Sequence, residues 1–535
     1  MATIGAEQIF KEFREHSAAE FFKKNRQMLG YSGAGRSLVT IVHEYTSNSL
    51  DAAEEAGILP DIKVEIKKLE NGHYTVSVAD NGPGIPKNFI GKALATIFAG
   101  TKFHRYMQQR GQQGIGAAGC LLFSQVTTGK PIYIKSSTGK GKCYSCRLGI
   151  NTALNRPIIT EMKESDDDFR GLFVEGEFSE VRYEAGDHGI YEYLRRTALA
   201  NPHAQIKLLE PEGKEWVFMR SVNKVPDRPP VTKPHPAGLD VNDLIEFAHL
   251  SPSRKISSFL TETFARTTSN KIDEIKAEDP TIDLDKPPKD LQWDDAEKLV
   301  KVFRKIKWIA PDPASVVPIG AENVTAAIKS ILDPEHMSVI GRKPKVFRGG
   351  VPFVVEAAVS YGGNSGKKVD EGYSGTILRY ANRVPLLFDS GSCAITKAAN
   401  DIDWKRYGLD LESQPISIFV NVSSVYIPYS GVGKEAVSQE EEIVEEIKLA
   451  IMEAARGIQR YVRGKEQISS SMSRYKAIAR YVKQLSGDIS SLTGKSQAAI
   501  ESKLDNIIKK HFPKLSEEDE ENTDVDGGGE ESDSG

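Results

Sequence analysis

The feature that most constrains the fold of this 535-residue chain is a succession of three motifs between residues 44 and 119. The first lies on a predicted helix, the second at the end of a predicted strand, and the third in a glycine-rich loop before an apolar run. Helical and strand-like segments follow one another through these motifs and on to about residue 218. The sequence therefore predicts an α+β layer, with a largely antiparallel sheet, up to about residue 218.

The first motif lies on an amphipathic helix predicted over residues 37–56, which ends at Gly57. Glu44, Asn48 and Asp51 are spaced by four and three residues, so they share one helix face. A carboxylate there can orient and activate water, and an amide oxygen can complete the shell of a hard cation. Taken alone, the same pattern is typical of a solvated helix face.

The second motif, DNGPG at residues 80–84, follows two alternating segments at 62–66 and 74–78 that flank an Asn-Gly turn. The pattern predicts a hairpin whose second strand ends at Asp80. A carboxylate there can accept a hydrogen bond from an exocyclic amine, and Gly84 lets a flat ring approach the backbone. A plain turn would have the same composition.

The third motif combines GTK at residues 100–102 with RGQQGIGAAG at 110–119, before the apolar run at 120–123. Backbone amides at a helix N-terminus bind phosphates, and Lys102 or Arg110 can add positive charge. A glycine-rich loop alone can equally be a flexible linker.

The rest of the chain divides at proline-rich runs. Residues 225–236 predict a domain boundary, and a mainly helical segment follows to about residue 309. A second proline cluster at 311–318 opens another α+β region, with a strand at 416–427. From residue 439 to about 512 the chain is nearly all helical in pattern, so the sequence predicts several domains.

The net charge of −4 conceals two parts of opposite sign. Residues 516–535 contain ten acids and no Lys or Arg, which leaves 64 acids against 70 bases in the body. The tail is disordered by composition, and the basic body suits a polyanionic partner without establishing one.

Cysteine content and hydropathy bear on location. Four cysteines favour a reducing cytoplasm, and Cys143 and Cys146, without a second pair, are more typical of plain thiols than of a metal site. We expect no membrane span and no signal peptide, because apolar runs are short and the N-terminus is highly charged.

In order and spacing, the three motifs together resemble the GHKL ATPases. One other segment, Gly494-Lys495-Ser496, resembles the end of a Walker A phosphate-binding loop. That loop needs four residues between its two glycines, and here six residues separate Gly487 from Gly494. Within that superfamily the chain resembles the B subunit of archaeal topoisomerase VI over almost its whole length outside the tail. The resemblance is carried by the segments GTKFHRYMQQRGQQGIGAAG (100–119), ANPHAQI (200–206), KPHPAG (233–238), RYANRVPLLFD (379–389) and SGVGKEAV (430–437).

The resemblance implies ATP and Mg²⁺ as cofactors and a role for each site residue. Glu44 would be the catalytic general base, Asn48 the magnesium ligand and Asp80 the adenine contact, with Gly84 beneath the ring. Lys434 would reach the γ-phosphate from the second α+β region and act in catalysis. The residues that would wrap the phosphates are Thr101, Lys102, Arg110, Gly111, Gln112, Gln113, Gly114, Ile115, Gly116 and Ala117.

The resemblance also implies an α+β multidomain architecture. Its parts would be an N-terminal dimerisation strap at 1–30, a GHKL (Bergerat) ATPase sandwich at 31–228, a helix-two-turns-helix insert at 229–309, an α+β transducer at 310–470, long C-terminal helices at 471–514 for contact with the A subunit, and a disordered acidic tail at 515–535. Asp401 and Asp403 follow a polar segment, so we predict a loop there rather than a metal-binding strand end.

The implied function is an ATP-hydrolysing subunit of a type IIB DNA topoisomerase. ATP-driven self-dimerisation would gate duplex passage through a break made by the A subunit, relaxing positive and negative supercoils and decatenating DNA. The implied partners are the A subunit of topoisomerase VI, in an A2B2 heterotetramer, and double-stranded DNA, with no membrane, in the nucleoid-associated cytoplasm. Basic residues at 342–348 (RKPKVFR), in the helical insert and along the C-terminal helices are candidates for phosphate contacts.

Several alternatives share the three motifs. A mismatch-repair ATPase or a heat-shock chaperone would resemble the later segments less well. A sensor histidine kinase would place its ATPase at the C-terminus, behind a phosphoacceptor helix. A nucleotide-binding scaffold without turnover is disfavoured by the intact Glu44.

Overall fold

The computed structural model describes residues 16–100, 105–111, 114–139, 141–370, 372–431 and 433–511. The chain forms two compact units. The first comprises the chain up to Asp403 with Asp410–Ala455, and the second comprises Trp404–Leu409 with the chain from Arg456 onward.

Within the described residues, the first sheet has eight strands in the order β5-β4-β3-β6-β2-β1-β7-β8. Its strands are β1 Asp61–Lys68, β2 Tyr74–Asp80, β3 Ile132–Ser137, β4 Lys142–Asn151, β5 Arg156–Asp166, β6 Gly171–Phe178, β7 Gln205–Leu209 and β8 Glu215–Phe218. All neighbours are antiparallel except β1 and β7. The predicted hairpin is confirmed, with Ile62 opposite Asp80 across β1 and β2.

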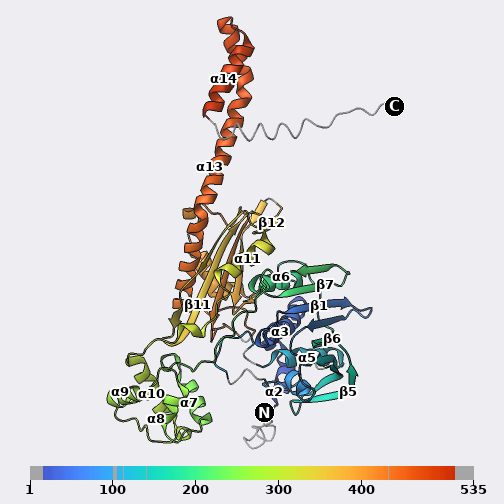
Figure 1. Cartoon of the computed structure of the whole chain (residues 1–535), viewed down its shortest axis with the longest axis vertical. Helices are drawn as coiled ribbons and strands as arrows, with labels where there is room; N and C mark the ends of the chain where they lie inside the picture. Colours follow the sequence, from blue (N-terminus) through green and yellow to red (C-terminus); the bar gives the residue numbers. More distant parts are fainter. Residues whose placement is uncertain are drawn as a thin grey trace, which may run out of the picture. The chain divides into compact units, whose positions relative to one another are not determined.

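Three helices pack on this sheet and on one another: α3 Ala34–Glu55, α5 Gly116–Thr128 and α6 Ile190–Ala200 (Figure 1). The predicted helix at 37–56 corresponds to α3, which begins one turn earlier. Its last residue is Glu55, and Gly57, two residues later, has a φ of +70° in the left-handed region. The Ile58 and Gly57 amides donate to the Ala53 and Glu54 carbonyls, a Schellman stop. The shorter elements are α2 Ala18–Lys24, η1 Arg26–Leu29, η2 Lys87–Phe89 and α4 Ile90–Leu94.

The middle segment is helical, as the sequence predicts, and has its own apolar core. Phe259, Phe264, Leu299 and Phe303 are buried in it. Its elements are η3 Pro236–Gly238, α7 Val241–Leu250, α8 Ile256–Thr263, α9 Ser269–Glu278, η4 Pro288–Asp290 and α10 Trp293–Lys305.

The second α+β region is built on another sheet, which in the described part of the chain has the order β10-β11-β16-β14-β15, with β9 also on β11. Its central strands β11 and β16 are buried almost throughout. The elements are η5 Pro313–Ser315, α11 Ala321–Leu332, β9 His336–Gly341, β10 Lys345–Phe347, β11 Val351–Tyr361, β12 Lys367–Val369, β13 Gly372–Ser374, β14 Thr376–Ala381, β15 Val384–Pro385, η6 Ser390–Ser392, α12 Ala394–Asn400 and β16 Ile416–Ser424. Asp401 and Asp403 lie outside helices and strands, as predicted.

The C-terminal part is helical, which confirms the long helices of the predicted fold class. Helix α13 spans Glu441–Thr493, and its portion beyond Ala455 lies in the second unit with η7 Trp404–Tyr407 and α14 Gln497–His511. The break between α13 and α14 falls at Gly494, with φ +67°. Among the described residues, no helix is both long enough and apolar enough to cross a membrane.

Candidate active site

A cavity of about 720 Å³ lies in the first unit, within the size range of small-molecule sites. Helix α3, the end of β2, the start of α5 and a loop of the second α+β region contribute to it. Of the residues predicted for binding or catalysis, its lining contains Glu44, Asn48, Asp80, Gly84, Gly111, Gly114, Ile115, Gly116, Ala117 and Lys434. Thr101, Lys102, Gln112 and Gln113 lie outside the described residues.

Glu44 faces the first residue of α5. A Cβ built at Gly116 would overlap the Glu44 carboxylate, so the absence of a side chain at Gly116 is what leaves room for it. Asn48 lies one turn further along α3, on the same cavity wall. The amides of the first turn of α5 have no partner within the helix, and with Glu44 they offer an acid-base group beside anion-binding donors.

Asp80 ends β2 and is 8% exposed. Its Oδ1 accepts from the Gly82 and Leu172 amides at 2.9 and 3.1 Å, and its Oδ2 accepts from the Ser49 hydroxyl at 2.7 Å. Burial raises the pKa of this carboxyl, against the lowering effect of the three hydrogen bonds. Because each carboxylate oxygen has two lone-pair positions, Oδ2 can accept a further donor from the cavity.

Gly84 lines the cavity, and two features of the fold require a glycine at this position. Its φ is +69°, and a Cβ there would overlap the Ser137 carbonyl on β3. The sequence predicts that this glycine contacts a ligand ring. The structure adds that β3 alone already excludes a side chain at this position.

Lys434 reaches the cavity from a turn in the second α+β region, where its own φ is +54°. The neighbouring Glu435 accepts from Arg36 Nε at 3.0 Å, and Arg36 also pairs with Asp389 at 3.3 Å. The Arg36 guanidinium lies 4.9 Å from the Phe388 ring centroid. These contacts hold the turn of Lys434 against the first turn of α3, so a lysine of one region and the carboxylate of Glu44 on the other line the same cavity.

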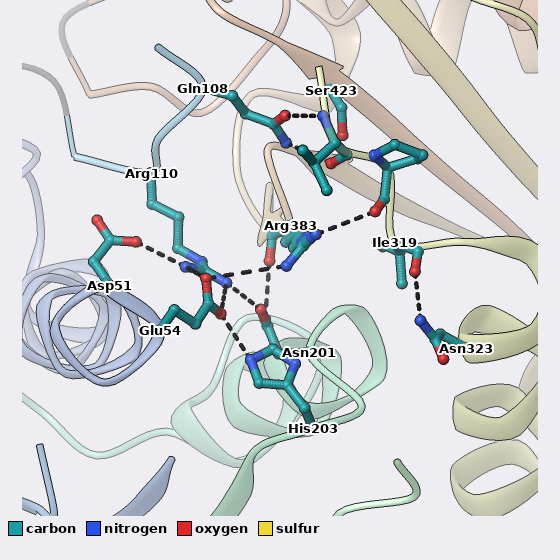
Figure 2. A network of polar contacts seen from close by, with 12 residues as sticks. Asp51, Glu54, Gln108, Arg110, Asn201, His203, Ile319, Asn323, Arg383 and Ser423 are labelled. Carbon is teal, nitrogen blue, oxygen red and sulfur yellow. Dashed lines mark hydrogen bonds and ion pairs between the residues drawn. The ribbon is translucent and has the colours of Figure 1, made fainter. Parts of the chain in front are cut away.

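The Arg110 side chain lies elsewhere. It is 7% exposed and donates to Asp51 at 2.7 Å and to both oxygens of Glu54 at 3.0 and 2.6 Å (Figure 2). Burial alone would raise the pKa of Glu54, but Arg110 and the neighbouring His203 and Arg383 outweigh it and hold that pKa well below its usual range. Arg110 is thus engaged in internal ion pairs, and it is not among the residues that line the cavity.

Comparisons with known proteins agree with this geometry. Residues 33–152 match the model of the histidine kinase-, DNA gyrase B- and HSP90-like ATPases, and residues 311–474 match that of the topoisomerase VI B subunit transducer. The chain is 44% identical over 502 residues to the B subunit of type 2 DNA topoisomerase 6 from Methanothermobacter thermautotrophicus, covering 93% of this chain and 96% of the relative. It is 41% identical over 572 residues to the protein of the same name from Thermococcus sibiricus, covering 98% and 100%.

The chain belongs to the family of topoisomerase VI B subunits. That membership confirms the predicted ATPase and transducer fold and removes the mismatch-repair, chaperone and sensor-kinase alternatives. Among solved structures, the ATPase region of Saccharomyces cerevisiae topoisomerase II is similar over 84% of this chain and 98% of that one, at 11% identity and a TM-score of 0.38. This TM-score is too low to bear on the family assignment.

Several residues of the site in this member of the topoisomerase VI B family are not predicted by the sequence pattern. Ser49 bonds Asp80 across 31 residues, and His43 lies 3.2 Å from the Tyr193 hydroxyl at the cavity wall. Both Ser49 and His43 are direct neighbours of predicted residues on α3, but nothing in the helix pattern distinguishes them. Phe388 and Glu435 could be found only from tertiary contacts.

The remaining thiols and acids form no metal site in the part of the chain that the structure describes. No group of three or more His, Cys, Asp or Glu side chains is arranged there to hold an ion. Cys143 and Cys146 are buried on β4 as free thiols, and burial raises the pKa of each. A cation at Asn48 would therefore depend on oxygens supplied by a ligand.

Proposed function

We propose that this protein binds and hydrolyses ATP as the B subunit of a type IIB DNA topoisomerase. ATP-driven pairing of two copies would gate the passage of a duplex through a break made by the A subunit, relaxing supercoils of both signs and decatenating DNA. The observation that carries the proposal is one cavity lined by Glu44, Asn48, Asp80, the start of α5 and Lys434. These groups come from both regions matched by the family models.

The chemistry of the cavity suits a purine nucleotide. Asp80 Oδ2 would accept from the exocyclic amine of adenine, and the amides of the first turn of α5 would face the phosphates. Glu44 would take a proton from the attacking water, which is the role of a general base. When bound, Mg²⁺ would neutralise phosphate charge, with Asn48 as its protein ligand.

Lys434 would couple the nucleotide to the second α+β region. A compact ammonium near the γ-phosphate favours the state in which that phosphate is present, and it stabilises charge that develops during hydrolysis. The Arg36–Glu435 pair supports this role because it holds the turn of Lys434 on α3. Loss of the γ-phosphate would remove the contact of Lys434 and release the region.

The proposed partners are the A subunit, duplex DNA and a second copy of this chain. Apolar side chains exposed on α13 and α14, including Tyr481 at 66% and Leu492 at 86%, suit a protein contact with the A subunit. Two of the candidate DNA residues already have internal partners: Arg342 pairs with Glu446 and Glu453, and Arg348 with Glu440. Within residues 342–348, the lysines that remain candidates for DNA contact are therefore the exposed Lys343 and Lys345. The N-terminal strap, residues 1–30, lies partly outside the described residues.

The experiment is the Glu44→Ala variant, assayed for binding of a non-hydrolysable ATP analogue, for turnover and for dimerisation. We expect analogue binding and analogue-induced dimerisation in sedimentation to persist, while turnover falls by about two to four orders of magnitude, as for a lost general base. Glu65→Ala, on β1 and away from the cavity, is the control and should hydrolyse ATP as the unmodified protein does. Relaxation of supercoiled plasmid should require ATP, Mg²⁺ and the copurified A subunit together. Normal turnover in Glu44→Ala would remove Glu44 from the mechanism, and no analogue binding by the unmodified protein would overturn the proposed function.

A further inference from the structure

The segment that leads into the glycine-rich loop is bonded to the second α+β region. Gln108, which is 6% exposed, donates from Nε2 to the Val317 carbonyl at 3.0 Å and accepts the Val317 amide at 2.7 Å (Figure 2). The next carbonyl, of Gln109, accepts from Asn382 Nδ2 at 3.2 Å. Two consecutive residues before the loop are therefore tied to the backbone or side chains of the other region.

Arg110 continues these contacts through a buried polar network. Its Nη2 donates to Asn201 Oδ1, and Asn201 Nδ2 donates to the Arg383 carbonyl at 3.1 Å (Figure 2). The Arg383 guanidinium lies 4.0 Å from Glu54, which also binds Arg110, and donates to the Pro318 carbonyl at 3.1 Å. Two cations from different regions thus share the Glu54 carboxylate on α3.

The far end of the network is fixed in the core of the second sheet. The Arg383 amide donates to Asn421 Oδ1 at 3.1 Å, and Asn421 Nδ2 donates to Glu356 Oε2 at 2.9 Å. Glu356, 1% exposed on β11, also accepts the Ile319 and Gly320 amides ahead of α11. A displacement of Arg383 would therefore have to move the strands β11 and β16 or break buried bonds.

Gly111, the residue after Arg110, lines the cavity, whereas Gln108, Arg110 and Arg383 do not. We propose that Gln108, Arg110 and Arg383 are positioning residues that anchor the start of the phosphate-binding loop to the second α+β region, as a link separate from Lys434. The proposal rests on the proposed ATP site and specifies how that site is regulated. Binding of a triphosphate to the loop and the position of the second sheet would each bias the other through this link.

The test substitutes Gln108, because its side chain is neutral whereas the other two positioning residues are charged. Removing Arg110 or Arg383 would strand buried carboxylates and could unfold the protein, whereas Gln108→Ala removes two neutral hydrogen bonds. Gln125 provides a matched control, since its side chain bonds the Ile150 carbonyl at 3.0 Å and the Ile150 amide at 2.9 Å, both inside the first α+β layer. The Gln125→Ala variant loses the same number and kind of bonds, but away from the loop.

We expect Gln108→Ala to weaken binding of a non-hydrolysable ATP analogue by roughly tenfold, the size of a lost contribution of about 1.4 kcal/mol. ADP affinity should change much less, so the ratio of the two affinities falls. Gln125→Ala should lower thermal stability similarly and leave the ratio unchanged. Equal ratios in the two variants would make the Gln108 bonds purely structural and overturn the proposal.

Hydrogen exchange on the full chain gives a second measurement. In the unmodified protein the ATP analogue should protect amides at residues 317–320 and 381–385 as well as those of the loop. In Gln108→Ala the loop should still be protected, and the protection of the two distant segments should be reduced. If the analogue binds the unmodified protein without protecting either distant segment, the link is absent even though the ATP site stands. If the analogue does not bind the unmodified protein, the proposed function itself fails.

Discussion

The close approach of Gly116 to Glu44 predicts that a substitution at Gly116 lowers ATP turnover without lowering the stability of the protein. Gly116 is the first residue of α5 and has a helical backbone, so alanine is conformationally allowed there. Its methyl group, however, would overlap the Glu44 carboxylate. We expect Gly116→Ala to displace the carboxylate from its position while the helix itself forms normally.

The two effects have different magnitudes. Alanine in place of glycine gains up to about 1 kcal/mol of helix propensity, so the melting temperature should be unchanged or slightly raised. Displacement of a general base lowers the rate by about 10² to 10⁴-fold, which corresponds to about 3 to 5 kcal/mol in the barrier. The Asp80 contact lies on another element and should keep adenine binding near normal.

The assay compares melting temperature, ADP affinity and ATP turnover in Gly116→Ala and in Gly119→Ala, one turn further along α5. A methyl group at Gly119 would lie 3.5 Å from Leu29 Cδ1 and 3.6 Å from the Tyr31 hydroxyl, which are ordinary contacts. We therefore expect Gly119→Ala to retain most of its turnover. The reasoning is refuted if Gly116→Ala folds and hydrolyses ATP as well as Gly119→Ala does.

Three further predictions concern Asp80, Lys434 and the exposed lysines. Asp80→Asn should weaken ATP binding and reduce selectivity over GTP. Because burial raises the pKa of Asp80, the affinity of the unmodified protein for ATP should fall as the pH is lowered through that raised pKa. Calorimetry should find no such pH dependence in the Asp80→Asn variant. Lys434→Ala should slow ATP turnover strongly and leave ADP affinity nearly unchanged. Lys434→Arg should not fully restore turnover, because a planar guanidinium differs from a compact ammonium. Turnover at the wild-type rate in Lys434→Ala would contradict this prediction. Charge reversal of Lys343 and Lys345 should reduce the slope of log DNA affinity against log salt concentration by about 0.9 per lost phosphate contact. An unchanged slope would show that neither lysine contacts DNA.

Local patterns in the sequence were sufficient for most of the secondary structure around the site. The alternation at 62–66 and 74–78 fixes the β1–β2 hairpin because strand faces repeat every two residues, and Gly57 marks the end of α3 because it can adopt a positive φ. The sequence predicts the start of α3 one turn too late, at residue 37, because Gly33 rather than a polar cap precedes the helix. The grouping of Glu44, Asn48, Asp80 and the glycine-rich loop follows from these elements and from the family resemblance.

Tertiary structure alone decided what each side chain contacts. The sequence predicts Arg110 as a cation for the phosphates, and the family resemblance alone assigns Lys434 to the γ-phosphate. In the structure Arg110 is enclosed by Asp51 and Glu54, while Lys434 lines the cavity. A buried guanidinium requires carboxylates around it, and those partners lie 59 and 56 residues away, beyond any local periodicity. Arg342 likewise finds its partners on α13, more than a hundred residues along the chain. Local spacing determines which residues share a face of a helix or strand, whereas the pairing of buried charges depends on how separate elements pack together.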